Sequence, residues 1–224
     1  MEARDKAGWD AVLTYAVGSA STVANPYGSL PSKTVRTHVR TGAGAWQGRK
    51  YVGVKTDTLN ISADAPGAVV KFDETALASY AVDDDLDAAL AVWTDDTPGV
   101  QWLGATTIDG VEVYPQSMSI QIGNALDRVR TVPDASFDKA HTKAVVEGRR
   151  EVAVTLDLWM EDLRYVRGAI DNDDPGDVAI TLGHSVVKTI TFKGVRYSDG
   201  SKAAIGQDKQ RQSVQLIASD VVIS

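Results

Sequence analysis

Few residues in this chain have the types and spacing that catalysis requires. The three histidines, His38, His141 and His184, lie far apart in the sequence, and no serine stands in the Gly-x-Ser-x-Gly turn that presents a hydrolase nucleophile. We therefore expect ordinary strand and loop histidines and no enzymatic activity. A catalytic triad assembled only in space is the alternative that the sequence leaves open.

The candidate metal and cofactor motifs are incomplete. Asp171, Asp173 and Gly176 match positions 1, 3 and 6 of a calcium loop, but Pro175 occupies position 5 and Leu182 stands where a bidentate glutamate is needed. The glycines at 42, 44 and 48 miss the spacing of a dinucleotide-binding loop, and no strand–turn–helix pattern surrounds them. We expect no metal site and no cofactor.

The tryptophans suggest a carbohydrate-binding site as an alternative function. Trp46, Trp93, Trp102 and Trp159 could form an aromatic platform for a sugar, as in a carbohydrate-binding β-sandwich. Tryptophans in an all-β chain are more often core or interface anchors, so we expect that role here.

Composition describes an acidic chain without cysteine. The 224 residues include 30 acidic and 23 basic residues, a formal charge of −7, and no cysteine. The chain is long enough to bury a core, and packing must stabilise it, because disulfides and thiolate zinc sites are excluded. The charge argues against tight binding of nucleic acid. No segment approaches the ~18 uninterrupted apolar residues of a membrane-spanning helix.

Two strands dominate the pattern. From Ser117 to Gly123, Met118, Ile120 and Ile122 alternate with polar residues, and from Gly148 to Met160 apolar side chains again occupy every second position. This period of two predicts half-buried strands, and the two segments can pair with their apolar faces on one side of a sheet. The fold class is therefore mainly β, an antiparallel β-sandwich or barrel with one flanking α-helix.

The segments before and after these two strands predict the remaining elements of the fold. We expect a short helix near residues 9–15, then an irregular arm up to residue 31 that contributes little to the core, and a single β-domain over 32–224. Residues 51–63 and 68–72 are predicted to form a hairpin about a turn at 65–67. Residues 77–92 indicate either a helix or an irregular crossover, and 161–170 have the apolar spacing of an amphipathic helix on the sandwich.

Two further features concern organisation. The order Trp-x-Gly, Gly-Val and alternating strand occurs at Trp46 and again at Trp102, with an echo at Gly194, which suggests that one strand–hairpin unit is repeated. The connection from Asn124 to Glu147 has no periodicity and is roughly twice the usual limit for a loop, so a functional role is expected.

The order and spacing of these strand segments resemble those of the tail tube proteins of long-tailed bacterial or archaeal viruses. The likeness is carried by Gly53-Val54 before the strand at 58–64, by the run from Met118 to Leu126, and by Gly148-Arg149-Arg150-Glu151-Val152. It continues to the closing strands and so covers nearly the whole chain. The Asp-rich segment at 81–96 has no counterpart that we can place.

The resemblance implies a structural virion protein located in the tail, assembled in the host cytoplasm and lacking cofactors. Its partners would be copies of itself in stacked rings, usually hexamers, together with tail-tip, tape-measure and tail-terminator proteins, while duplex DNA passes through without specific binding. The family's long hairpin loop reaches between rings. Related secretion-type or gene-transfer tubes are the nearest alternatives.

Candidate residues follow from this resemblance and from the strand pattern. The Asn124–Glu147 connection offers charged residues for contacts between subunits or rings, and the polar faces of the two main strands offer side chains for the lumen. The contact candidates are Arg128, Arg130, Asp134 and Asp138. The lumen candidates are Ser117, Ser119, Gln121, Glu151, Ala153, Thr155 and Asp157.

Overall fold

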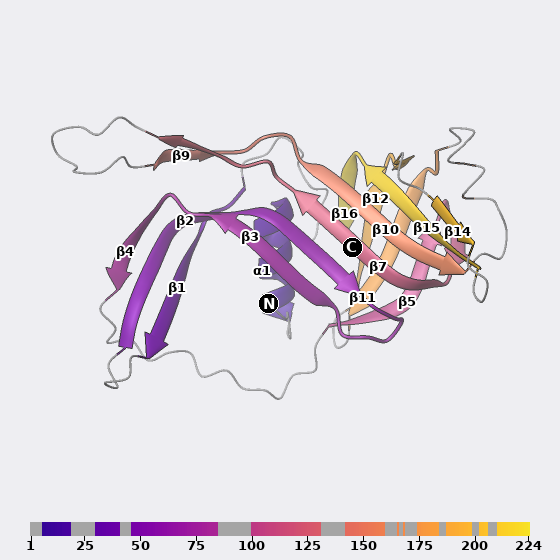
Figure 1. Ribbon diagram of the computed structural model, residues 1–224, viewed down its shortest axis with the longest axis horizontal. Coiled ribbons are helices and arrows are strands. Elements are labelled where there is room, and N and C mark those ends of the chain that lie inside the picture. Colours follow the sequence, from indigo (N-terminus) through magenta and orange to yellow (C-terminus); the bar gives the residue numbers. More distant parts are fainter. Residues whose placement is uncertain are drawn as a thin grey trace.

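The computed structural model places its elements around the two strands singled out above (Figure 1). It describes residues 6–18, 30–40, 46–84, 100–130, 142–159, 165, 168, 174–183, 187–198, 202–205 and 210–224. Statements about structure below refer to these residues.

Strands β7 (Pro115–Gly123) and β10 (Glu151–Trp159) pair antiparallel, as predicted. Ile120 lies opposite Val154 and Ser119 lies opposite Thr155, so each strand contributes its apolar set to one face and its polar set to the other. The register fixes the sidedness, because a slip of one residue would expose the whole apolar set.

The pair lies in the middle of a nine-stranded antiparallel sheet, here called the large sheet. The long strand β2 flanks β7, and β15 flanks β10. Its other strands extend these two sides. The bounds are β1 Lys33–Arg40, β2 Trp46–Ala63, β3 Lys71–Leu77, β4 Tyr80–Asp84, β13 Arg196–Tyr197, β14 Lys202–Ile205 and β15 Gln210–Ala218.

A five-stranded sheet, here called the small sheet, covers the apolar face of the large one. Its order is β16-β12-β11-β5-β6. Its bounds are β5 Gln101–Ile108, β6 Val111–Val113, β11 Asp177–Gly183, β12 Val187–Lys193 and β16 Asp220–Ile223. Trp102, Ile180 and Phe192 of the small sheet are fully buried in one core with Ile120 and Leu156 of the large sheet. The predicted antiparallel β-sandwich is therefore confirmed.

Helix α1 (Lys6–Val17) contributes more than the sequence predicted. The helix near residues 9–15 was expected, but no packing in the core was predicted for it, and the arm after it was expected to contribute little to the core. Instead Val12, Leu13, Ala16 and Val17 are buried in the same core as the sheets, and Leu30 is buried too. Positions i, i+1, i+4 and i+5 form one apolar stripe on a helix, and this stripe packs inward.

Strand β4 corrects the reading of residues 77–92 as a helix or an irregular crossover. Residues 80–84 pair with β2, and the remaining residues from 85 onwards lie outside the described ranges. The cause is the length of β2: its second half pairs with β3 and its first half with β4 on one side and β1 on the other. We call β1, β4 and the first half of β2 the wing.

The proposed repeat is not reproduced by the structure. Gly53 lies inside β2, whereas Gly110 lies in the turn between β5 and β6 and Gly194 follows β12. All three have a positive φ, which explains why glycine recurs, but they stand in different structural settings. Of the helix expected at 161–170, only residues 165 and 168 are described, and both are helical.

Candidate functional site

The outer face of the large sheet within the sandwich is polar; we call it the polar face. Ser119 lies opposite Thr155 and Gln121 lies opposite Ala153 across the β7–β10 pair. The Oγ of Ser117 donates a hydrogen bond of 2.7 Å to Oδ2 of Asp157. The structure therefore brings the predicted lumen candidates together on one surface, with Glu151 exposed at the end of the row.

Neighbouring strands continue this polar face in register. Ser62 of β2 lies opposite Ser119, and Gln215 of β15 lies opposite Thr155. The other described members on β2, β3 and β15 are Thr58, Asn60, Lys71, Asp73, Thr75, Ser213 and Ile217. Hydroxyl, amide and small side chains dominate, and the one lysine in this set is paired with Asp64 at 2.8 Å.

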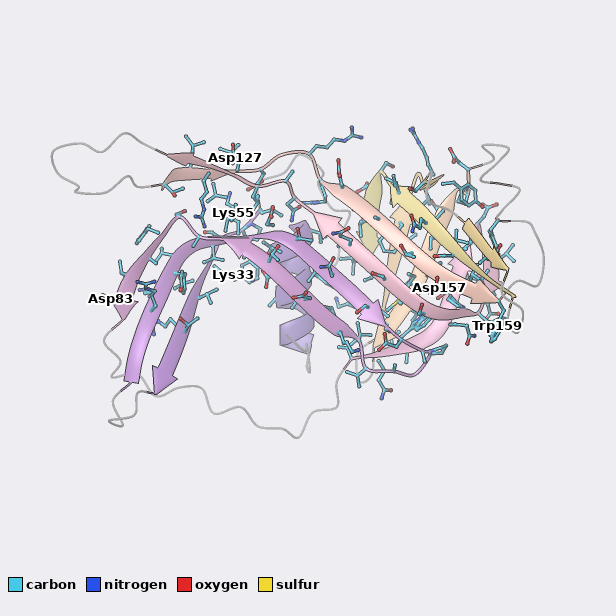
Figure 2. All side chains as sticks on the ribbon, viewed as in Figure 1. Lys33, Lys55, Asp83, Asp127, Asp157 and Trp159 are labelled. Carbon is cyan, nitrogen blue, oxygen red and sulfur yellow. The ribbon has the colours of Figure 1, made fainter. Side chains whose placement is uncertain are left out.

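A second surface is formed by the hairpin of β8 (Asp127–Arg130) and β9 (Thr142–Val146), here called the ribbon. It joins β7 to β10 and extends toward the wing end of the molecule, away from Asp157 and Trp159 at the far end of β10 (Figures 1 and 2). The connection between the main strands is thus a long hairpin, as the resemblance implied.

Two of the four predicted contact residues lie in the ribbon. Arg128 is exposed in β8, and Arg130 ends that strand. Asp134 and Asp138 lie outside the described residues. Val129 and Val146 are 42% and 48% exposed, so the ribbon carries apolar as well as charged side chains on its surface.

The ribbon is anchored by a polar cluster that the sequence did not predict, here called the ribbon root: Lys55, Asn124, Glu147 and Arg150. Asn124 is 2% exposed. Its Nδ2 donates to the carbonyl oxygens of Ala16 and Thr56, each at 3.0 Å, and its Oδ1 accepts a bond of 2.9 Å from Nε of Arg150. The side-chain amide therefore joins α1, β2 and the start of β10.

Arg150 completes the connection to the helix. Its Nη1 donates to the carbonyl oxygen of Val17 at 3.2 Å. Burial lowers the pKa of the Arg150 guanidinium, while the carboxylates of Glu147 and Asp220 act in the opposite direction. An arginine stays charged under these conditions, so the site holds a permanent, partly desolvated cation.

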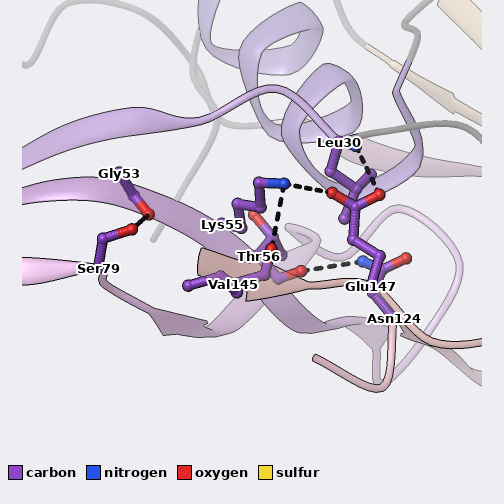
Figure 3. Close-up of polar contacts among 8 residues, drawn as sticks. All are labelled: Leu30, Gly53, Lys55, Thr56, Ser79, Asn124, Val145 and Glu147. Atoms are coloured by element: carbon purple, nitrogen blue, oxygen red, sulfur yellow. Dashed lines mark hydrogen bonds and ion pairs between the residues drawn. The ribbon is translucent and has the colours of Figure 1, made fainter. Parts of the chain in front are cut away.

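Lys55 and Glu147 form the outer part of the root (Figure 3). Nζ of Lys55 lies 2.5 Å from Oε1 of Glu147, and the Lys55 side chain is 18% exposed. Oε2 of Glu147 accepts a bond of 2.9 Å from the backbone N–H of Leu30. A part-buried pair with additional hydrogen bonds fixes geometry better than a solvated surface pair does.

The backbone is unusual in both connections at the root, 124–126 and 147–150. Ala125 has φ 47°, a left-handed conformation that is uncommon for a residue with a Cβ. A Cβ at Gly148 would lie 2.7 Å from the carbonyl oxygen of Ala125, so only glycine fits there without a shift. Two of the motifs that carry the resemblance, Gly-Asn-Ala and Gly-Arg-Arg, thus contain Asn124 and Arg150 of the root.

The alternative sites gain no support from the described residues. Trp102 is fully buried, so it belongs to the core and not to a sugar platform. His38 lies in β1, while His141 and His184 lie outside the described ranges. In the described part of the chain no three histidine or acidic residues are grouped to hold a metal ion, and no helix there has the length and apolarity to cross a membrane.

Comparison with known families accounts for the chain over nearly its whole length. A model of the phage tail tube protein family matches residues 3–219, whereas no curated protein matches the chain. The match covers the large sheet, the ribbon with its root, and the small sheet except β16. The chain belongs to the phage tail tube protein family, a family of structural virion tail components that is not an enzyme family.

Proposed function

We propose that the protein polymerises into stacked rings whose central channel conducts duplex DNA, with the polar face lining that channel. The observation that carries this proposal is the difference between the two faces of the large sheet. One face is buried against the small sheet, and the other is mainly polar, with Ile217 and Trp159 as exposed apolar side chains on it. Contacts with tail-tip, tape-measure and terminator proteins, and assembly in the host cytoplasm, belong to the same proposal.

The margins of the sheets favour joining through the large sheet. Within the sandwich the large sheet ends in β3, seven residues long, on one side. On the other side it ends in β13 and β14, two and four residues long, which pair with successive parts of β15. The small sheet ends in β6 and β16, which have three and four residues. An edge strand presents a row of backbone groups that a second copy can pair with, and a longer strand offers more of them.

Closure through these margins determines which face lines the channel. A sheet that closes on itself becomes a barrel with one inner and one outer face. Because the small sheet covers the apolar face, we place the small sheet on the outside of the ring and the polar face toward the channel. Neighbouring strands lie about 4.8 Å apart, so the six strands β3, β2, β7, β10, β15 and β13 span about 29 Å of arc per copy. The inner sheet of a ring of six copies would then have a circumference of about 170 Å.

The chemistry of the polar face suits passage of DNA without retention. Duplex DNA carries one phosphate charge per ~1.7 Å, and lysine or arginine side chains on a channel wall would bind it at many points. The predicted lumen residues are serine, threonine, glutamine, alanine and two carboxylates. These residues offer hydrogen bonds to water but no strong attraction for phosphate. The exposed Arg196 of β13, opposite Ile217, is a basic side chain near the margin of the same face.

The direct test is electron microscopy of the purified full-length protein, alone and with tail-initiating proteins. We expect rings or tubes with an open axial channel, in which a density map places β7 and β10 at the inner wall. Protein that remains monomeric under all these conditions, and that forms no tube in virions, would contradict the proposal.

A charge placed on the channel wall should slow DNA without preventing assembly. We expect the double variant Ser119→Lys and Thr155→Lys to form tubes, but DNA release from particles should be slower by about tenfold or more at low salt and recover as salt rises. The measurement is the rate of release at several ionic strengths.

The matched control lies on the other sheet. Thr181 and Thr189 are also a cross-strand pair, with their Oγ1 atoms 3.2 Å apart on the outer face of the small sheet. Thr181→Lys with Thr189→Lys should leave the release rate unchanged. Equal slowing by both double variants would place the channel wall elsewhere.

A further inference from the structure

The ribbon root does more than close a loop. We propose that Asn124 and Arg150 are positioning residues that couple the N-terminal helix to the ribbon, so that the ribbon holds its direction only while α1 is docked in the core. The importance of that direction for tube growth rests on the proposed function, whereas the coupling itself does not.

The first argument is convergence. Asn124 stands where the chain leaves β7 for the ribbon, and Arg150 stands where it returns to β10. Their side chains reach adjacent carbonyl groups of α1, those of Ala16 and Val17, at 3.0 and 3.2 Å. Carbonyl groups in the last turn of a helix have no partner within the helix, so the two ends of the ribbon supply what the helix end lacks.

The second argument is that every hydrogen-bonding group of Asn124, in its side chain and its backbone, has a partner. Both side-chain N–H groups and the side-chain oxygen are bonded, its backbone N–H donates to the carbonyl of Asp57 at 2.7 Å, and its own carbonyl accepts from the N–H of Gly148 at 3.2 Å. A rotation of the ribbon about its base would break these bonds together. Because the side chain is buried, water could not replace them at low cost.

The third argument is a second tether to the same region of the chain. Glu147, the residue after β9, accepts a bond from the backbone of Leu30 and pairs with Lys55 of β2. The ribbon therefore holds the N-terminal region both at the end of α1 and at Leu30. Such contacts shared by two elements make their local stabilities depend on each other, and the dependence acts in both directions.

The experiment measures hydrogen exchange in the full-length protomer. Leu13 is 1% exposed in the core and has no bond to the root. Two amides beside the root report on it, because the N–H of Leu126 donates to Oδ1 of Asp57 at 2.9 Å and the N–H of Gly148 donates to the carbonyl of Asn124 at 3.2 Å.

Leu13→Ala should loosen α1 and, through the coupling, raise the exchange rates of these two amides about tenfold, while Ile120 and Val154 in the central strands stay protected. Faster exchange in α1 with unchanged rates at the root would overturn the proposal.

The reciprocal experiment changes a residue of the root and measures hydrogen exchange in the helix. Arg150→Met should speed exchange at the end of α1, and Arg149→Met, at the exposed neighbouring residue, should not. Equal effects of the two variants, or none from Arg150→Met, would also overturn the proposal. If Arg150→Met does not fold, the Leu13→Ala arm decides alone.

Polymerisation separates this inference from the proposed function. If the wild-type protein forms tubes and Leu13→Ala loosens the root as expected, this variant should form fewer or shorter tubes. Normal tube growth despite a loosened root would show that the direction of the ribbon is not important for assembly. If the wild-type protein forms no tubes, the proposed function fails, and the exchange rates still decide the coupling.

Discussion

Replacing residues 128–145 by a short Gly-Ser linker is expected to abolish tube growth and leave a folded protomer. Val145 is the described ribbon residue that is buried, and it does not belong to the sandwich core. Folding should therefore survive, because the retained root residues Asn124 and Glu147 keep their bonds to Ala16, Thr56, Lys55 and Leu30. If the ribbon reaches the next ring, its removal takes away that contact altogether.

The measurement is sedimentation and electron microscopy of the shortened protein, with circular dichroism and thermal unfolding as the check on folding. A charge-reversal variant at the exposed Arg128, Arg128→Glu, gives a graded comparison and should weaken assembly without abolishing it. Long tubes formed by the shortened protein would show that the ribbon is not the contact between rings.

Leu156→Ala is expected to lower the free energy of unfolding by about 2–5 kcal/mol. Leu156 is fully buried in the sandwich and lies between Met118 of β7 and Val214 of β15 in the register. Removing its branched end leaves a cavity at the centre of the core, where neighbouring strands cannot move inward without losing their pairing.

Thr155→Ala is the matched control for this prediction. Thr155 is the adjacent residue on the same strand, but its side chain lies on the polar face, so its loss should change the free energy of unfolding by less than about 0.5 kcal/mol. Urea unfolding of the protomer under conditions that prevent polymerisation measures both variants. Similar losses for the two would mean that the assigned faces of β10 are wrong.

The sequence predicted those parts of the fold in which the physical signal is local. Ile120 and Val154 belong to runs in which one face is buried and the other is not, so a period of two is visible without any knowledge of the partner strand. The pairing of the two runs and the polar surface behind them followed from the same alternation.

The remaining parts depend on residues distant in sequence. Strand β4 exists because β2 is long enough to accept it, and the strands of the ribbon are exposed along most of their length, so neither has a clear alternation. The ribbon root joins residues from four separate segments, which are Ala16, Lys55, Asn124, and the connection that contains Glu147 and Arg150. The signals visible in the sequence were only an asparagine and a glycine, Asn124 and Gly148, at the two ends of a long connection.

The large sheet ends in different strands at its two margins, β3 on one side and β13 with β14 on the other. Identical copies joined across these margins would form heterologous, head-to-tail contacts and not isologous contacts about a twofold axis. Every ring would then have an upper and a lower rim of different chemistry, and the cylinder built from them would have a polarity. Growth would proceed from one rim, and the two ends of the finished tail would bind different closing proteins.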